Sequence, residues 1–315
     1  MLHIKEYYNT IIIDNDIEEI VIDYLIHPLD NLPISISKIT IKKSVNIYRR
    51  QNKIPYNCKL IIENISINNI ASFNKMKEED YLDITELNLY NNKMTSIPES
   101  IGSLINLQKL ILSSNEITCI PDFISLLINL ETLCLDDNKI TSIPDFIGLL
   151  VNLQILYLHH NKIINIPWSI ESLINLQTLC LCYNQITSIP ESISSLVNLK
   201  ILNLGYNQIT SVPESIGLLI NLKNLNLSNN KIISIPESIS SLVNLKILNL
   251  GYNQLTSIPE TISSLVNLQT LSLLYNQITS VPESISSLIN LKNLNLSNNK
   301  IISIPESISS LVNLQ

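Results

Sequence analysis

Residues 199–221 read LKILNLGYNQITSVPESIGLLIN, and this 23-residue stretch decides the fold. Leu202 and Leu204 alternate with polar, small or outward-facing neighbours, which predicts a short β-strand with one buried face. The segment SVPESIGLL (211–219) places a proline and then an acidic residue at the start of a helical segment, where both are well tolerated. The stretch therefore predicts one strand and one short helical segment joined by loops.

The same unit recurs ten times without a gap between Ile84 and Asn313, as L-x-x-L-x-L-x-x-N-x-I-x-x-I-P-x-x-I-x-x-L-x-N. A fixed period in the twenties, with leucine, asparagine and isoleucine in phase, indicates a leucine-rich-repeat solenoid. We expect the amide at the asparagine of each loop to satisfy backbone groups that are otherwise buried without a partner. This asparagine column consists of Asn92, Asn115, Asn138, Asn161, Asn184, Asn207, Asn230, Asn253, Asn276 and Asn299.

One unit alone buries too little apolar surface to offset the conformational entropy that folding removes. Stacked units cover each other's apolar faces and share one continuous core. Because successive strands run in the same direction, the stack predicts a parallel β-sheet on the inner curve and helical segments on the outer curve. The fold class expected is α/β.

With these positions in place, residues 84–313 resemble the 23-residue I-P-x-x-I-x-x-L class of intracellular leucine-rich-repeat proteins, which includes Ras-pathway scaffolds and their plant relatives. The resemblance implies a right-handed horseshoe with a concave parallel sheet and short convex helical segments. It carries over no catalytic residue, because the shared positions belong to the core and the turns. The composition, rich in isoleucine and asparagine, is also similar to that of proteins from amoebae and giant viruses.

Charge and cysteine content narrow the class of protein further. The net charge is −7 and the pI is about 5.2, which disfavours nucleic acid or an anionic membrane as a partner. No apolar run reaches the roughly 18 residues of a membrane span, and the isoleucine run at 11–13 is too short for a secretory signal. Five cysteines, an odd number, with no cysteine-rich flank predict a reduced, cytoplasmic protein.

Residues 1–80 lie outside the repeat phase and form the first predicted region, before a repeat domain at 81–315. We expect a short amphipathic helix at 18–26, ended by the segment 30–33. A bulged strand at 34–41 and a second strand at 60–67 follow from their alternating isoleucines. One interpretation is an N-terminal cap on the first repeat; the other is an F-box-like, adaptor-binding segment.

The outward strand positions and the adjoining loop must supply any binding specificity, because the buried columns are nearly uniform. Repeats 2–5 have the most varied outward residues, mixing aromatic, apolar and charged groups. The tyrosines at 183, 206, 252 and 275 form a column that either anchors a partner or packs between adjacent loops. The predicted partner-binding residues are Ile111, Asp136, Tyr157, His159, His160, Cys182, Tyr183 and Tyr206.

A metal or nucleophile site was weighed at the same place. Asp136, His159 and Cys182 share one column on successive units, so their backbones are expected about 4.8 Å apart, and Cys180 shares their face. Such groups can bind zinc, but the spacing matches no zinc motif, and no third group or oxyanion hole accompanies a cysteine–histidine pair. We therefore predict no catalytic residue, metal or cofactor.

These patterns predict a non-enzymatic scaffold that binds a protein partner on the concave face of the repeats. The alternative is the substrate receptor of a ubiquitin ligase, in which residues 1–80 recruit an adaptor. The pattern stops at Leu314 and Gln315, two residues into an eleventh unit, without a polar capping repeat. Because a solenoid end needs cover, we expect either a truncated chain or another covering element.

Overall fold

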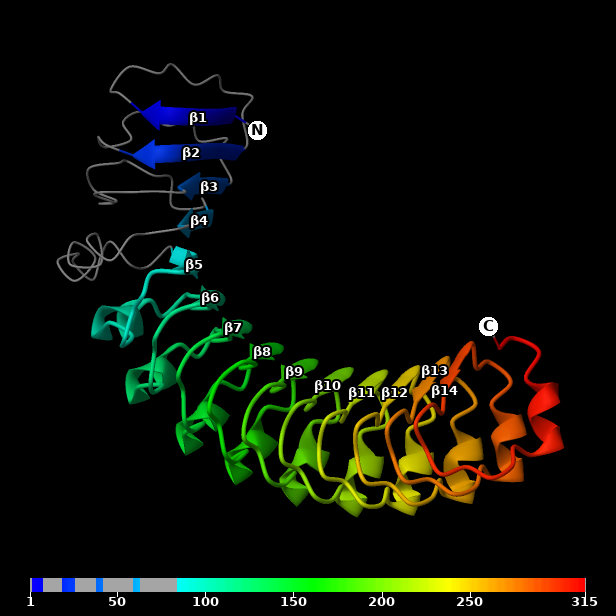
Figure 1. Cartoon of the computed structure of the whole chain (residues 1–315). Coiled ribbons are helices and arrows are strands. Elements are labelled where there is room, and N and C mark those ends of the chain that lie inside the picture. The colour runs from blue at the N-terminus through cyan, green and yellow to red at the C-terminus, as the bar shows by residue number, and fades with distance from the viewer. Residues whose placement is uncertain (1, 8–18, 26–37, 42–58, 63–83, 315) are drawn as a thin grey trace. The chain divides into compact units, whose positions relative to one another are not determined.

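The computed structural model describes residues 2–7, 19–25, 38–41, 59–62 and 84–314. The chain divides into two compact units, Met1–Lys139 and Ile140–Gln315. Each unit consists of short parallel strands and five-residue 3₁₀-helices (Figure 1). In the described residues, no helix has both the length and the apolar character needed to span a membrane.

The first unit contains a parallel sheet in which strands that are neighbours in sequence are neighbours in space. Leu87 pairs with Leu110, and Leu110 with Leu133, so the register advances by one repeat from strand to strand. Its described strands are β1 (Leu2–Tyr7), β2 (Glu19–Leu25), β3 (Lys38–Ile41), β4 (Lys59–Ile62), β5 (Ile84–Asn88), β6 (Lys109–Ile111) and β7 (Thr132–Cys134).

The N-terminal region holds a correction to the sequence analysis. The helix predicted at 18–26 is wrong, because Glu19–Leu25 forms strand β2, paired in parallel with β1 and β3. β-branched residues at 20–22 explain the difference, since they favour strands. The F-box-like interpretation thereby loses its helix. β3 and β4 confirm parts of the two predicted strands, while 34–37 and 63–67 lie outside the described residues.

Strands β1–β4 continue the pairing of the repeats back toward the N-terminus. Ile20 pairs with Ile39, Ile39 with Leu60, and Leu60 with Ile84. The step between paired residues is therefore 19, 21 and 24 residues, and the register shifts between Leu60 and Ile61. These strands extend the sheet of the first unit with coils of unequal length, which the strict 23-residue pattern did not detect.

The second unit repeats one coil at a constant register. Leu202 pairs with Leu179 on one side and with Leu225 on the other, a step of 23 residues each time. Its strands are β8 (Ile155–Tyr157), β9 (Thr178–Cys180), β10 (Ile201–Asn203), β11 (Asn224–Asn226), β12 (Ile247–Asn249), β13 (Thr270–Ser272) and β14 (Asn293–Asn295).

A 3₁₀-helix lies on the side of each coil opposite the strand (Figure 1). A proline in extended conformation precedes each one, and an acidic residue begins all but η5, as the sequence predicted. In the first unit they are η2 (Glu99–Ser103) and η3 (Asp122–Leu126). In the second they are η4 (Asp145–Leu149), η5 (Trp168–Ser172), η6 (Glu191–Ser195), η7 (Glu214–Leu218), η8 (Glu237–Ser241), η9 (Glu260–Ser264), η10 (Glu283–Ser287) and η11 (Glu306–Ser310).

The core lies between the sheet and the 3₁₀-helices, as the repeat pattern predicted. In the unit at 199–221, the in-phase leucines and isoleucines have no exposed surface, and Val212 is 8% exposed. The asparagine column is also confirmed. Asn207 donates from Nδ2 to the carbonyl oxygens of Leu181 and Leu204 at 3.0 Å, and its Oδ1 accepts the Ile186 N–H at 2.9 Å.

Candidate functional site

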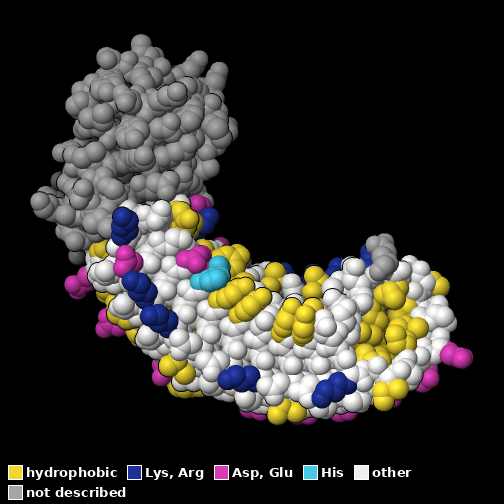
Figure 2. All heavy atoms as spheres, viewed as in Figure 1, with side chains coloured by type: hydrophobic (Ala, Val, Ile, Leu, Met, Phe, Trp, Pro, Cys, Tyr) yellow, Lys and Arg dark blue, Asp and Glu magenta, His cyan; other side chains and the backbone are white. Residues whose placement is uncertain are grey.

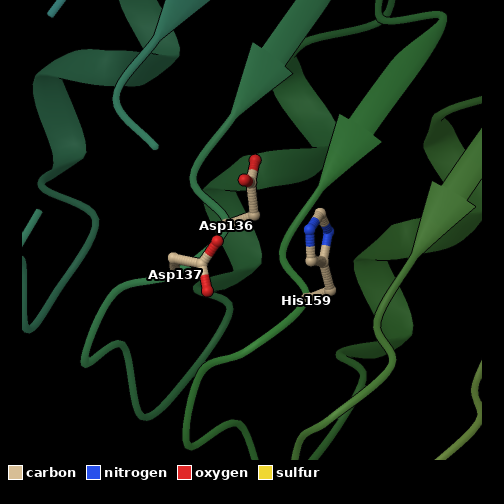
Figure 3. A group of neighbouring side chains, drawn as sticks. All are labelled: Asp136, Asp137 and His159. Atoms are coloured by element: carbon tan, nitrogen blue, oxygen red, sulfur yellow. The ribbon is translucent and has the colours of Figure 1, made fainter. Parts of the chain in front are cut away.

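The predicted residues of the first unit end or follow its last strands. Ile111 ends β6 and Asp136 follows β7, and both are half-buried. Asp136 Oδ1 accepts a hydrogen bond from Ser113 Oγ at 2.7 Å. Asp137 is exposed, and Figure 3 shows Asp136 and Asp137 leaving the end of β7. These carboxylates are therefore tied to the strand ends of their own unit.

The predicted residues of the second unit begin at the end of β8. Tyr157 ends the strand, and half-buried His159, labelled in Figure 3, follows it. The rings of Tyr157 and His159 meet edge to face, with their centroids 6.1 Å apart. The next residue, His160, is exposed, and its ring centroid lies 5.7 Å from that of His159. The strand end therefore delivers an aromatic group onto the adjoining loop.

Three rings stack on successive loops of the second unit. His160 stacks on Tyr183 with 4.1 Å between centroids, and Tyr183 stacks on Tyr206 at 4.0 Å. The planes differ by only 11° and 12°. Tyr183 and Tyr206 are still 41% and 44% exposed, so the stack is a surface feature. Figure 2 shows a histidine patch continued by hydrophobic side chains on this face.

A second, separate stack lies farther along the same unit. Tyr252 and Tyr275 have centroids 4.5 Å apart and planes 14° apart, and they are 44% and 47% exposed. Asn229 occupies the position between the two stacks. The sequence left open whether the tyrosines pack between loops or face a partner. The structure shows that they do pack on one another and that a large part of each ring stays accessible.

The stacked residues occupy a strained backbone position. Each lies immediately before an asparagine of the column and has a positive φ, for example 52° at His160 and 55° at Tyr183. Asparagine and aspartate adopt this conformation far more readily than tyrosine does. The left-handed column, as we name it, consists of Asn91, Ser114, Asp137, His160, Tyr183, Tyr206, Asn229, Tyr252, Tyr275 and Asn298.

The rings of the first stack are also joined through their phenol groups. A hydrogen bond with Tyr206, and to a smaller extent burial, raises the pKa of Tyr183. The neutral phenol is the form that this contact stabilises. The stack is therefore uncharged at Tyr183 at neutral pH, and it offers an apolar surface with polar tips.

The cysteines at the predicted site favour contact over chemistry. Burial raises the pKa of Cys182, and it raises the pKa of Cys134 to about 11, with Asp136 adding to the effect. A raised pKa disfavours the thiolate, which is the form that attacks substrates and binds zinc. Cys182 is therefore a poor nucleophile at neutral pH, and we propose no chemistry for it.

Two features of the site were not found from the sequence. Tryptophan was expected on the outer surface, and Trp168 is indeed 64% exposed at the first position of η5. The strained left-handed column, however, was missed. Its signal was present, because Asn91, Asp137 and Asn229 are the residue types that favour positive φ.

Family models for leucine-rich repeats match most of the repeat region. One, described as leucine-rich repeats in two copies, matches residues 84–125, 174–217 and 266–314. Another, described as leucine-rich repeat, matches residues 105–163 and 220–278. No curated protein sequence matches the chain significantly. The repeats of this family are generally interaction modules and not enzymes.

Several solved structures are similar to the chain. The ectodomain of the receptor kinase GASSHO1/SCHENGEN3 from Arabidopsis thaliana, in complex with CASPARIAN STRIP INTEGRITY FACTOR 2, is 24% identical with a TM-score of 0.71. The match covers 95% of this chain and 44% of that one. In PEPR1–AtPEP1 the identity is 32% and the TM-score 0.68, covering 76% of this chain and 35% of that one.

A third structure is the plant peptide hormone receptor RGFR1 in complex with RGF2. It is 25% identical with a TM-score of 0.57, and the match covers 94% of this chain and 64% of that one. The chain thus spans less than two thirds of each of these receptors. The repeat pattern, the parallel strands and the family models agree, and the chain belongs to the leucine-rich-repeat family.

Proposed function

We propose that the chain is a non-enzymatic interaction scaffold that binds a protein partner through the sheet side of its repeats. The observation that carries this proposal is the exposed stack of His160, Tyr183 and Tyr206. Tyrosine is enriched among the residues that dominate interface energies, because it offers rigid area with a polar tip. Three such rings at a strained backbone position are more than the core of the solenoid requires.

The similar receptors support a polypeptide as the partner. RGFR1 is a peptide hormone receptor whose structure contains RGF2, and GASSHO1/SCHENGEN3 is in complex with CASPARIAN STRIP INTEGRITY FACTOR 2. Both receptors are also longer than this chain, so their ligands are not transferred to it. What we take from them is that arrays of this fold bind polypeptides.

We also propose an intracellular location. Cys119, Cys134, Cys180 and Cys182 are free thiols in the described part of the chain, and Cys119 is exposed. Free exposed thiols persist in the reducing cytosol and are oxidised outside it. The chain should therefore be recovered with these four thiols unmodified when cells are lysed in the presence of a thiol-blocking reagent.

The test is capture of partners from cell lysate, read by mass spectrometry. The full chain is compared with a variant carrying Tyr157→Ala, His159→Ala and Tyr183→Ala. The control carries Tyr252→Ala and Tyr275→Ala, which remove the second stack only. A partner that is lost with the first variant and retained by the control supports the proposal. A partner retained by both variants at full yield contradicts it.

A further inference from the structure

A row of lysines borders the sheet of the second unit on the side opposite the left-handed column. Lys200, Lys223 and Lys246 immediately precede β10, β11 and β12, and all three are exposed. The Lys223 N–H donates to the Lys200 carbonyl at 2.8 Å, and the Lys246 N–H donates to the Lys223 carbonyl at 2.8 Å. The three lysines therefore lie on directly adjacent coils, roughly 4.8 Å apart at the backbone.

This row of like charges has no carboxylate beside it in the described structure of the second unit. Lys200 Nζ donates to a neutral acceptor, Gln177 Oε1, at 2.8 Å. In the first unit, by contrast, Lys139 pairs with Glu116 at 2.7 Å across two coils. All carboxylates of 140–315 belong to 3₁₀-helices on the other side of the coils: Asp145, Glu171, Glu191, Glu214, Glu237, Glu260, Glu283 and Glu306.

Like charges on neighbouring strands repel one another, so the row reduces the stability of the folded array unless a partner neutralises it. The repulsion is confined to one rim of the sheet. The strand residues beyond the row are uncharged, as in Ile201, Asn224 and Ile247. The sheet side of these three coils is therefore positive at one edge and neutral elsewhere.

A second set of donors ends the same three strands. Asn203, Asn226 and Asn249 are half-buried at the ends of β10, β11 and β12. Each Oδ1 accepts the backbone N–H two residues later, at 3.2, 3.0 and 3.1 Å respectively. Because only an oxygen can accept from an N–H, these bonds fix the orientation of the amides. The Nδ2 groups are left as donors on the sheet side.

The six residues Lys200, Lys223, Lys246, Asn203, Asn226 and Asn249 form what we name the lysine–asparagine strip. We propose that this strip binds an acidic, extended segment of a polypeptide. Its free polar atoms are nearly all donors, and carboxylates and main-chain carbonyls are the acceptors that such a segment supplies. This inference rests on the proposed function, since it names the chemistry of the partner.

The dimensions fit a short segment lying across the strands. Three coils span about 10 Å at 4.8 Å each, which three to four extended residues cover at roughly 3.3 Å per residue. The lysine and asparagine rows are also about 10 Å apart along each strand, since three residues separate Lys200 from Asn203. Acidic side chains on one face of the segment therefore reach the lysines while its backbone lies toward the asparagines.

Nucleic acid is the less favoured polyanion. The chain carries a net charge of −7, and the carboxylates of the second unit form a row along its 3₁₀-helices. Nucleic-acid interfaces are strongly positive over areas larger than three lysines. A polypeptide with a few carboxylates requires only the local positive rim.

The test measures binding of fluorescent peptides to the full chain by anisotropy. The probes are an extended glutamate-rich peptide, the same peptide with glutamine in place of glutamate, and a single-stranded oligonucleotide. The strip variant carries Lys200→Gln, Lys223→Gln and Lys246→Gln. The control carries Lys162→Gln, Lys231→Gln and Lys300→Gln, which remove the same charge from lysines beside the asparagine column, outside the strip.

We expect the acidic peptide to bind more tightly than the glutamine peptide, and to lose about tenfold in affinity in the strip variant and less than about twofold in the control. Asn226→Asp should weaken it further, because aspartate keeps the acceptor for Ser228 N–H but removes the donors. Equal affinity for the two peptides, equal loss in both variants, or tighter binding of the oligonucleotide would overturn the inference. A lysate partner lost with the aromatic variant but retained by the strip variant would also overturn it while leaving the proposed function intact.

Discussion

The asparagine column and the left-handed column are adjacent residues in every repeat, yet they obey opposite rules. Asn207 is buried, and its amide bonds to three backbone carbonyls and one N–H. Tyr206, one residue earlier, is 44% exposed and stacks on another side chain. The backbone therefore dictates one residue type in the first column, whereas the second column tolerates asparagine, serine, aspartate, histidine and tyrosine. Repetition here marks hydrogen-bonding demand, and variation marks the surface that is free to specialise.

The largest effect should come from breaking the buried column. Asn207→Ala removes four hydrogen bonds and leaves their backbone partners buried, so we expect the free energy of unfolding to fall by roughly 3 kcal/mol or more. Tyr206→Ala should cost less than about 1 kcal/mol, because the lost stacking is offset by relief of backbone strain. Urea unfolding followed by circular dichroism measures both. Equal costs would refute the contrast between the columns.

The next effect concerns binding through the variable column. Tyr183 contacts rings on both sides, so Tyr183→Ala should open the first stack and weaken a captured partner by about tenfold or more. Asn298→Ala, in the same column, should change the affinity by less than about twofold. Titration of the isolated partner by calorimetry gives both values. A larger loss at Asn298 would place the contact elsewhere on the chain.

Thiol chemistry offers a smaller test of buried against exposed positions. At about pH 7.5, Cys119 should react with iodoacetamide at least about tenfold faster than Cys134. Cys119 is exposed, while burial raises the pKa of Cys134 to about 11 and lowers its thiolate fraction. The rate at Cys134 should rise as the pH approaches that value. Peptide mapping by mass spectrometry follows each site, and comparable rates would contradict the burial of Cys134.

The smallest effect is on a phenol group. Tyr206→Phe removes the hydrogen bond that raises the pKa of Tyr183, so this pKa should move down toward its ordinary value. Because the folded pKa is raised, the contact stabilises the protein below the ordinary tyrosine pKa of about 10, and this contribution is lost as the pH rises through the folded value. Carbon-13 tyrosine NMR follows the titration. An unchanged Tyr183 pKa would show that burial alone causes the shift.

The strict repeat was enough to predict the fold of residues 84–313, because each buried column depends on residue type alone. Leu202, Ile209 and Asn207 are placed as their phase predicts. The positive φ at Tyr183 could not be inferred from tyrosine itself, and the stacking distance depends on how two loops meet. The strand at 19–25 was mistaken for a helix because acidic residues interrupt its isoleucines and the period there is not 23. The proposed binding residues remain predictions.

Repeats 7 and 10, Leu222–Asn244 and Leu291–Asn313, are identical at all 23 positions, and the strands between them pair at an unchanging step. A genetic exchange that deletes or duplicates the 69 residues between their equivalent points would join coils that already fit. Every buried contact at the junction would be one that the array contains elsewhere. The length of the array can therefore change by three coils in a single event, without an intermediate that has to repair its core.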